Sequence, residues 1–345
     1  MRIALDATYS LGEHLSGVGV YSQELLRGLA RAHPEQRFQW CYRAHRYLRS
    51  FAETPPPNCR RALLQEPWLP LPRAFFHGLN QRLPAMRFRK TVATFHDLFV
   101  LTGDYSTPEF RRRFAEQARH AAAESDLIIA VSQFTAGQVQ QHLGVEPERI
   151  HVIHHGARAP AGPAPTACEN VILNVGAIQR RKNIGRLVNA FEQIAPGWQL
   201  VLAGSAGYGA EEILRQIELS PRRDSIRVLG YVGAAELASW YARARVFAFP
   251  SLDEGFGMPV LDAMAAGVPV VASNRSAVPE VCGTAALLVD PEDTAALAQA
   301  LDQVIQNEGL AGDLIARGRR RAAEFTWEQA AVKTWKVYEK LLEKP

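Results

Sequence analysis

The chain has 345 residues and a formal net charge of +4, and its 47% hydrophobic and 21% charged residues are typical of a soluble globular protein and exclude a disordered one. Its length exceeds the usual size of one hydrophobic core and predicts two domains. No apolar stretch approaches the ~18 residues of a membrane span, and the N-terminus enters a strand pattern directly, so we expect a cytoplasmic protein with neither a transmembrane helix nor a signal peptide.

Strand-like and helix-like segments alternate along the chain. Short apolar runs typical of buried strands occupy residues 2–7, 91–98, 126–132, 149–156, 170–176, 198–204, 226–232, 245–251, 268–273 and 285–290. Helix-period segments occupy residues 18–32, 108–124, 133–143, 184–195, 234–244 and 292–306. This alternation predicts α/β domains with doubly wound parallel sheets covered on both faces. The Pro/Gly/Ala-rich segment 157–167 predicts a linker, which separates domains at 1–160 and 161–325.

Ligands of open parallel sheets bind beyond the carboxyl ends of the strands, so the loops that follow strands are the candidates for a site. In the stretch SGVGVYSQELL, Gly17 and Gly19 precede a helix, where backbone amides can face an anion. The stretch matches neither GxGxxG nor GxxxxGK, so a tight turn explains it equally well. His96 ends the apolar run 91–98 at the strand edge, which ranks it above the other histidines as a site residue.

The stretch NVGAIQRRKN, residues 174–183, places three cations directly before a helix. Arg181 and Lys182 would oppose the dipole of that helix unless an anion lies between them, so the pattern favours a phosphate site. A solvent-exposed basic turn is the alternative. We expect the Lys182 ammonium to be exposed and to contribute little to stability.

Two acids lie eight positions apart in the stretch SLDEGFGMPVLDAMAAGVPVV, residues 251–271. Glu254 is in a glycine-rich turn, and Asp262 is inside an apolar segment that otherwise reads as a buried helix. Gly257 and Pro259 suit the start of this helix. Neither acid suits its surroundings unless a polar group meets it.

The sequence predicts no metal centre and no resident cofactor. It contains no DxD pair, and no His, Cys, Asp or Glu cluster has metal-ligand spacing. Cys41, Cys59, Cys168 and Cys282 show no CxxC spacing, which favours free thiols. A nucleotide ligand would therefore need protein cations in place of Mg²⁺.

Residues 60–119 hold 11 basic and 5 acidic residues. They include the cluster Arg87, Arg89 and Lys90 and the run 111–113, with Trp68, Phe75, Phe76 and Phe88 among the aromatic residues. One interpretation is a solvated basic face, and the other is a surface for anionic lipid headgroups or a lipid-linked phosphate. Nucleic acid is not expected as a partner, because no nucleic-acid-binding module accompanies the cluster.

The order of the motifs resembles that of the family-4 retaining glycosyltransferases of the GT-B fold. The motifs are GVGVYS, HDL, AVSQFTA, VGAIQRRKN, LVLAG, VLGYV and FPSLDEGFGMPVLDAMAAGVPVV. The resemblance implies two Rossmann-like domains that face each other across a cleft, with the acceptor on the first and a nucleotide sugar on the second. It also implies that the last helix, within 326–345, crosses back to the first domain.

The family signature of two acids separated by seven residues corresponds to Glu254 and Asp262. The resemblance implies that Glu254 meets hydroxyls of the donor sugar, assisted by the backbone of Gly255, Phe256 and Gly257. Asp262 takes the place of a glutamate that binds the ribose, and it is one methylene shorter than that residue.

The remaining roles also follow from matching positions. Arg181 and Lys182 would neutralise the diphosphate, and many relatives carry a further Arg where this chain has Ala177. Gly17 matches the glycine that approaches the distal phosphate, and Gly19 lies in the same motif. His96 resembles the histidine near the 6-position of the sugar. The nucleobase would be read by the turn Gly230, Tyr231 and Val232.

The resemblance implies metal-independent transfer of a hexose, with retention, to a lipid-linked saccharide acceptor. It is strongest to the mannosyltransferase branch that builds lipopolysaccharide O-chains, so GDP-mannose is the favoured donor. A GDP-linked 6-deoxyhexose such as GDP-rhamnose, or a UDP-sugar, is the alternative. A sugar-nucleotide epimerase and a non-catalytic sugar-nucleotide-binding protein are the rival classes. Because the acceptor is membrane-anchored, we expect peripheral attachment to the inner face of the cell membrane.

Overall fold

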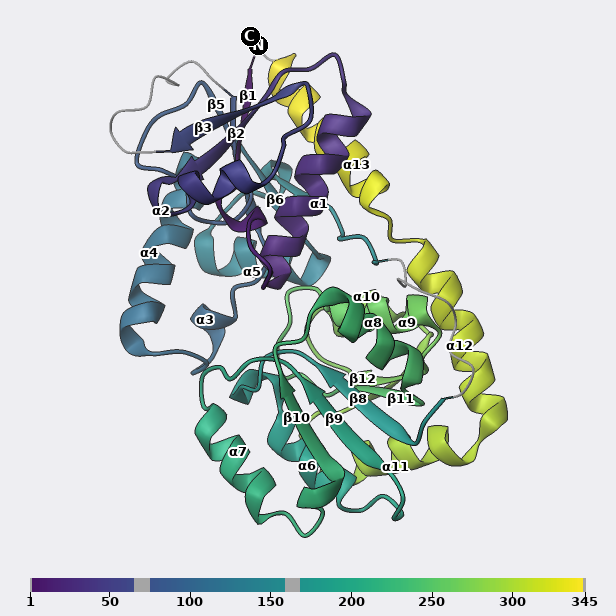
Figure 1. Cartoon of the computed structure of the whole chain (residues 1–345). Helices are drawn as coiled ribbons and strands as arrows, with labels where there is room; N and C mark the ends of the chain where they lie inside the picture. Colours follow the sequence, from purple (N-terminus) through teal and green to yellow (C-terminus); the bar gives the residue numbers. More distant parts are fainter. Residues whose placement is uncertain (1, 65–74, 159–167, 344–345) are drawn as a thin grey trace. The chain divides into compact units, whose positions relative to one another are not determined.

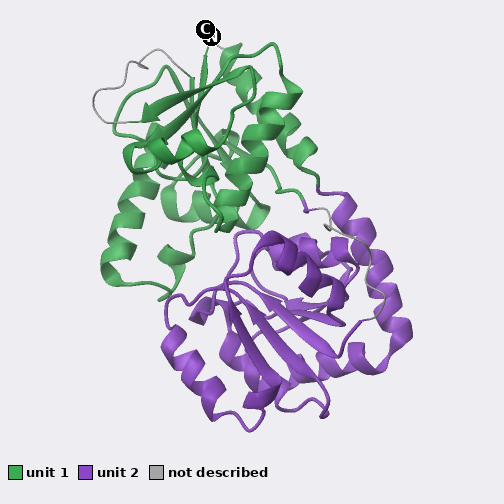
Figure 2. Ribbon diagram, viewed as in Figure 1, with its two compact units in different colours: residues 1–156, 326–345 green, residues 157–325 purple. Residues whose placement is uncertain are grey.

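The computed structural model describes residues 2–64, 75–158 and 168–343 (Figure 1). The chain divides into two compact units (Figure 2). Unit 1 comprises Met1–Gly156 and Thr326–Pro345, and unit 2 comprises Ala157–Phe325. Each unit is built on a parallel sheet, which confirms the predicted α/β class.

Among the described residues, unit 1 has a seven-stranded parallel sheet with the order β3-β2-β1-β4-β5-β6-β7. Its strands are β1 (Ile3–Asp6), β2 (Phe38–Arg43), β3 (Cys59–Leu64), β4 (Phe75–Gly78), β5 (Lys90–Phe95), β6 (Leu127–Ala130) and β7 (Ile150–Val152). Its helices are α1 (Gly17–Ala32), α2 (Ala44–Tyr47), α3 (Phe99–Thr102), α4 (Pro108–Glu124), α5 (Gln133–Leu143) and α13 (Trp327–Leu342). Short 3₁₀ segments include Thr8–Ser10 and Leu48–Ala52.

Local signals explain where these helices begin and end. The side chains of Ser16, Thr107 and Ser132 accept backbone N–H bonds at the starts of α1, α4 and α5. Helix α5 ends at Gly144, which has φ +65°, a left-handed conformation that glycine adopts without steric cost.

The C-terminal helix α13 lies beside α1 in unit 1 (Figure 1). A Cβ atom on Gly28 of α1 would lie 3.1 Å from the Cβ of Ala331, so the missing side chain allows the two helices to approach closely. The Tyr338 hydroxyl forms a 2.6 Å hydrogen bond with Nδ1 of the buried His77, and Nε2 of His77 bonds Thr94 at 2.9 Å. Helix α13 is therefore tied into the core of unit 1 by polar and apolar contacts.

Three strands of this sheet, β2, β3 and β4, were not predicted. Strand β3 is an edge strand and carries Arg60 and Arg61, so it lacks a continuous apolar run. Strand β4 has only four residues and contains His77. This histidine is acceptable in the core because both of its ring nitrogens are hydrogen-bonded, which the sequence does not reveal.

Unit 2 has, among its described residues, a six-stranded parallel sheet with the order β10-β9-β8-β11-β12-β13. Its strands are β8 (Val171–Val175), β9 (Gln199–Ala203), β10 (Ile226–Gly230), β11 (Val246–Phe249), β12 (Val270–Ser273) and β13 (Ala286–Val289). Its helices are α6 (Ile184–Phe191), α7 (Ala210–Leu219), α8 (Ala234–Arg243), α9 (Met258–Ala266), α10 (Val278–Cys282), α11 (Thr294–Gln306) and α12 (Glu308–Ala323). All six strands coincide with predicted apolar runs, because strands buried on both faces carry continuous apolar sequence.

The strand order of each sheet shows where a ligand would be expected to bind. In unit 1 the connections run one way from β1 and the other way from β4, so the order reverses between these two strands. In unit 2 the corresponding reversal lies between β8 and β11. Loops that leave neighbouring strands diverge at such a point and open a crevice at the carboxyl edge of the sheet.

Candidate functional site

The candidate site of unit 2 lies where the loops that follow β8 and β11 meet. Backbone is packed closely here: a Cβ atom on Gly204, after β9, would lie 1.9 Å from the carbonyl oxygen of Gly176, after β8. Lys182 lies over the same turn, because a Cβ atom on Gly176 would be 3.2 Å from its Cε. Glycine at these positions therefore lets side chains of the next loop reach the strand ends.

A basic 3₁₀ turn, Arg180–Lys182, carries the cations of the site. The next residue, Asn183, has φ +58° and begins α6. Its side-chain amide donates hydrogen bonds to the carbonyl oxygens of Pro250 and Pro291 at 3.1 and 2.6 Å, and the Leu252 N–H donates to the Arg181 carbonyl oxygen at 2.8 Å. These bonds fasten the basic turn to the loop that follows β11 and, at Pro291, to the segment that follows β13.

Two cations converge on one carboxylate in this turn. Nζ of Lys182 lies 2.5 Å from Oε1 of Glu254, and Nη1 of Arg181 lies 3.0 Å from Oε2. All three residues are buried, with 7–8% of their surface exposed. The expectation of an exposed Lys182 is therefore wrong: the ammonium is buried against Glu254 and lies 4.9 Å from the ring centroid of Phe249.

Backbone bonds hold Glu254 in place. Its N–H donates to the Ser276 hydroxyl at 3.0 Å, and its carbonyl oxygen accepts from the Ala277 N–H at 3.2 Å. Burial raises the pKa of the Glu254 carboxyl, but Arg181 and Lys182 lower it by more, to about 2. Glu254 is therefore ionised at neutral pH and can accept hydrogen bonds from hydroxyl groups.

Backbone strain also borders this site. Among the described residues, those other than glycine with positive φ are Asn183 and Ser276, at +58° and +57°. Asn183 begins the helix after the cations, and Ser276 bonds Glu254. Such conformations persist where surrounding bonds enforce them, and they cluster at functional sites.

The other acid, Asp262, is on α9 and has 5% of its surface exposed. Its carboxylate accepts three hydrogen bonds from Arg158: from the backbone N–H at 3.0 Å, from Nε at 3.0 Å and from Nη2 at 2.6 Å. Burial raises the pKa of Asp262, and Arg158 partly offsets this effect. Sequence reasoning missed Arg158, because a lone arginine in a Pro/Ala-rich segment carries no periodic or motif signal.

The remaining predicted residues of unit 2 lie in loops at the same sheet edge. Gly255, Phe256 and Gly257 connect Glu254 to α9, and Gly257 has φ +107° at its N-terminus. The Phe256 ring packs 6.0 Å from that of Phe325. Gly230, the last residue of β10, has φ +70°, and in the turn that follows Tyr231 is exposed and Val232 is buried.

His96, Gly17 and Gly19 belong to unit 1. His96 follows β5 and is buried, and its Nε2 donates to the Leu79 carbonyl oxygen at 2.9 Å. Burial lowers the pKa of His96 to about 4, so its ring is neutral at physiological pH. The Gly19 N–H donates to the Ser16 side chain, and a Cβ on Gly19 would lie 2.9 Å from the Tyr9 carbonyl oxygen. Gly19 therefore serves helix capping and close packing, whereas Gly17 is exposed at the start of α1.

Comparisons with known proteins decide the family. The family model described as Glycosyltransferase Family 4 matches residues 15–158, and that described as Glycosyl transferases group 1 matches residues 169–307. O-antigen chain mannosyltransferase B of Escherichia coli is 34% identical over 284 residues, which cover 77% of this chain and 74% of that protein. The chain belongs to the family-4 glycosyltransferases.

Solved structures establish the fold of this glycosyltransferase. Sucrose-phosphate synthase from Thermosynechococcus elongatus superposes with a TM-score of 0.78 and 23% identity over 100% of both chains. HepE from Anabaena, solved in complex with UDP and glucose, has a TM-score of 0.74 and 18% identity over 99% of each chain. The predicted GT-B fold is confirmed.

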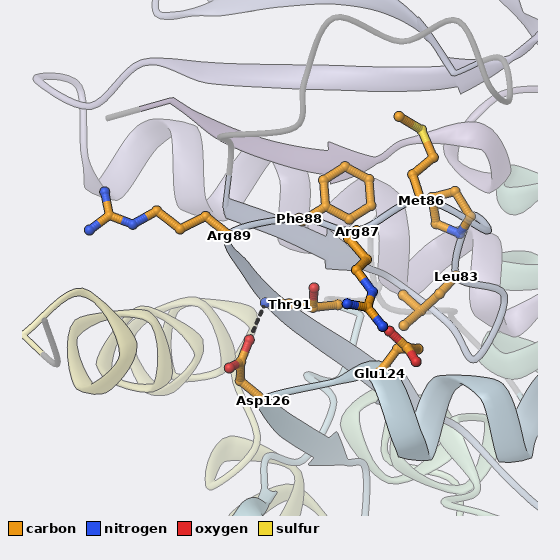
Figure 3. A pocket seen from close by; sticks show the side chains of 9 residues that line it. Leu83, Met86, Arg87, Phe88, Arg89, Thr91, Glu124 and Asp126 are labelled. Carbon is orange, nitrogen blue, oxygen red and sulfur yellow. Dashed lines mark hydrogen bonds between the residues drawn. The ribbon is translucent and has the colours of Figure 1, made fainter.

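The basic cluster of the glycosyltransferase lies at the other edge of the unit 1 sheet. Arg87 and Arg89 line a small pocket of about 160 Å³ before the first residues of β5 and β6, where the Thr91 N–H donates to Asp126 at 2.7 Å (Figure 3). Glu124 and Asp126 also line the pocket and offset the positive charge. This amino edge is opposite to the edge where ligands of parallel sheets bind.

The aromatic part of the proposed membrane surface is corrected by the structure. Phe75 and Phe76 have none of their surface exposed, because they form β4 in the middle of the sheet. Phe88 is half-buried and stacks on Phe76 with a centroid distance of 4.3 Å. Trp68 lies outside the described residues. The large apolar side chains that are exposed in unit 1 include Leu48 and Phe51.

In the part of the chain that the structure describes, no group of three or more His, Cys, Asp or Glu side chains has a geometry that could hold a metal ion. A search of the same residues finds no helix that combines the length and the apolar character needed to span a membrane.

Proposed function

We propose that this glycosyltransferase transfers mannose from GDP-mannose, with retention, to a lipid-linked saccharide in the synthesis of a lipopolysaccharide O-chain or a related polysaccharide. One observation carries the proposal: Arg181 and Lys182 converge with Glu254, buried, at the point where the strand order of unit 2 reverses. Arg181 and Lys182 bring two buried positive charges to this point. A nucleotide diphosphate would supply the matching anion.

The same geometry suggests how the reaction is assisted. Arg181 and Lys182 would stabilise the diphosphate as negative charge develops on it, in a site where low exposure strengthens the interaction. Glu254, ionised at neutral pH, would accept hydrogen bonds from the donor sugar, with the amides of Gly255 and Gly257 nearby. Substitution on the face that the phosphate leaves would retain the anomeric configuration. The two cations would fill the role that Mg²⁺ has in other transferases, so we propose metal-independent transfer.

The similarity to the mannosyltransferase of Escherichia coli supports mannose as the sugar and an O-antigen chain as the product. The structure of HepE with UDP and glucose keeps a UDP-sugar as the alternative donor, alongside a GDP-linked 6-deoxyhexose. The backbone turn at Gly230, Tyr231 and Val232 would read the base.

Thermal unfolding with GDP-mannose, GDP-rhamnose and UDP-glucose tests the donor, because a ligand that binds only the folded state raises the melting temperature. GDP-mannose is expected to give the largest rise, and a rise with UDP-glucose alone would move the assignment to the alternative. Isomerisation of the nucleotide sugar without an acceptor would indicate an epimerase. Donor binding with neither transfer nor slow hydrolysis would indicate a non-catalytic protein.

Lys182→Ala tests the site itself. Loss of one group that stabilises the leaving charge is expected to lower kcat by a factor of about 10²–10³. Lys333→Ala, which removes an exposed lysine from α13, is the matched control and should leave kcat unchanged. Normal turnover in Lys182→Ala would remove this residue from the site.

We further propose that unit 1 binds the acceptor and contacts an anionic membrane surface peripherally. Leu48 and Phe51 are 81% and 58% exposed, and Arg46 and Arg49 lie on the same short helical segment. Each basic residue near an anionic bilayer contributes about 1 kcal/mol. The protein should sediment with anionic vesicles at low salt, and Leu48→Ser with Phe51→Ser should weaken this more than Arg87→Glu with Arg89→Glu. Equal sedimentation with neutral vesicles, or none with either, would contradict the proposal.

A further inference from the structure

The position that family resemblance gives to the ribose is occupied by a different contact. The Asp262 carboxylate is almost completely buried, and Arg158 donates to both of its oxygens, its backbone N–H to Oδ1 and its guanidinium to Oδ2. Charge-assisted hydrogen bonds of this kind are the strongest that side chains make. A ribose hydroxyl would have to compete with Arg158 for a buried carboxylate, and a neutral hydroxyl is the weaker donor.

Arg158 lies where the chain first enters unit 2. It is the second residue after Gly156, the last residue of the first segment of unit 1. The preceding residue, Ala157, donates its N–H to the carbonyl oxygen of Phe325, the last residue of unit 2, at 3.0 Å. The residues at which the chain enters and leaves unit 2 are therefore bonded to each other.

The segment that carries Glu254 contacts both places where the chain crosses between the units, the first at Arg158 and the second at Phe325. Asp262 of α9 holds Arg158 at the first crossing, and Phe256 packs against Phe325 at the second. Seven residues separate Glu254 from Asp262, and the last four of them form the first turn of α9. Movement of either crossing would therefore act directly on the loop and helix of the candidate donor site.

We propose that Asp262 is a positioning residue that fastens the connection between the units to α9 through Arg158, and that it is not a ribose ligand. The inference rests on the proposed function in one respect: transfer would need the loop that carries Glu254 to be held in a productive geometry. Loss of the contact then lowers kcat and leaves donor recognition largely intact.

Ribose discrimination separates the two roles. We would measure the dissociation constants of GDP and 2′-deoxy-GDP for the wild type, Asp262→Ala and Arg158→Ala, together with kcat and the donor KM. The expected result is a GDP to 2′-deoxy-GDP ratio within about twofold of the wild type, a KM within about threefold and a kcat at least tenfold lower in both variants. A ratio that falls to unity in Asp262→Ala alone would show a ribose ligand and would overturn the inference while leaving the proposed function standing.

A double-mutant cycle tests the contact without any donor. If Arg158 and Asp262 act together, the double variant should lose no more melting temperature than the more damaged single variant. The Arg243 and Glu169 pair, which is also bidentate but more exposed, provides the matched cycle within unit 2. Additive losses at 158 and 262 would overturn the inference. Strong coupling without transfer from any donor would instead count against the proposed function alone.

Discussion

Replacement of Glu254 by glutamine is expected to destabilise unit 2 substantially. The neighbouring cations hold the pKa of this buried carboxyl at about 2, compared with 4.5 for an ordinary glutamate. By linkage, a difference of that size corresponds to about 3 kcal/mol of stability at neutral pH. Because the folded-state pKa is the lower one, this stability is complete above pH 4.5 and is lost as the pH falls towards 2. Glutamine keeps the shape and removes the charge that Arg181 and Lys182 share.

Urea unfolding at pH 7 and at lower pH measures this effect. The difference between the wild type and Glu254→Gln should be about 3 kcal/mol at pH 7 and should shrink below pH 4.5. Glu218→Gln, on an exposed position of α7, is the control and should stay within about 0.5 kcal/mol of the wild type. A Glu254→Gln variant as stable as the wild type at pH 7 would refute the view that these three groups form a coupled ionic cluster.

Three further predictions follow from the geometry. In a urea titration, Gly204→Ala should lower the free energy of unfolding by at least about 1–3 kcal/mol, because its Cβ would meet the Gly176 carbonyl oxygen, and it should disrupt donor binding. Gly233→Ala, which has open space around the new Cβ, should unfold like the wild type. Burial lowers the pKa of His96 to about 4, so NMR should show a neutral imidazole from pH 8 to 5.5. The contribution of His96 to the stability of unit 1 should be complete above pH 6.5 and should fall as the pH drops towards 4. A titration midpoint near pH 6.5 would contradict the burial of this ring. Transfer activity should persist in excess EDTA, and strict dependence on added Mg²⁺ would contradict the role given to Arg181 and Lys182.

The sequence was most informative where burial leaves a continuous apolar run. All strands of the unit 2 sheet follow from such runs, and the long helices α1, α4 and α5 follow from their helical periodicity. Prediction failed for β2, β3 and β4, where an edge position or polar side chains interrupt the apolar pattern. His77 is the clearest case, because its partners Thr94 and Tyr338 are 17 and 261 residues away.

The sequence predicted which residues belong to the candidate site but not which of them contact one another. The motif RRKN and the acid Glu254 are 72 residues apart, and only the fold shows that they form one buried cluster. The exposure of Lys182 was predicted wrongly, since no local pattern indicates a distant carboxylate. The partner of Asp262 was also hidden, because Arg158 is 104 residues away in a segment without periodicity.

Sugar transfer can be measured directly. Radiolabelled GDP-mannose would be incubated with the wild type, Lys182→Ala and Lys333→Ala in the presence of a lipid-linked mannosyl acceptor, and the anomeric configuration of the product would be read by NMR. We expect an α-linked mannosyl product with the wild type and Lys333→Ala, and at least a hundredfold less with Lys182→Ala. An inverted linkage, or equal transfer by all three proteins, would contradict this expectation.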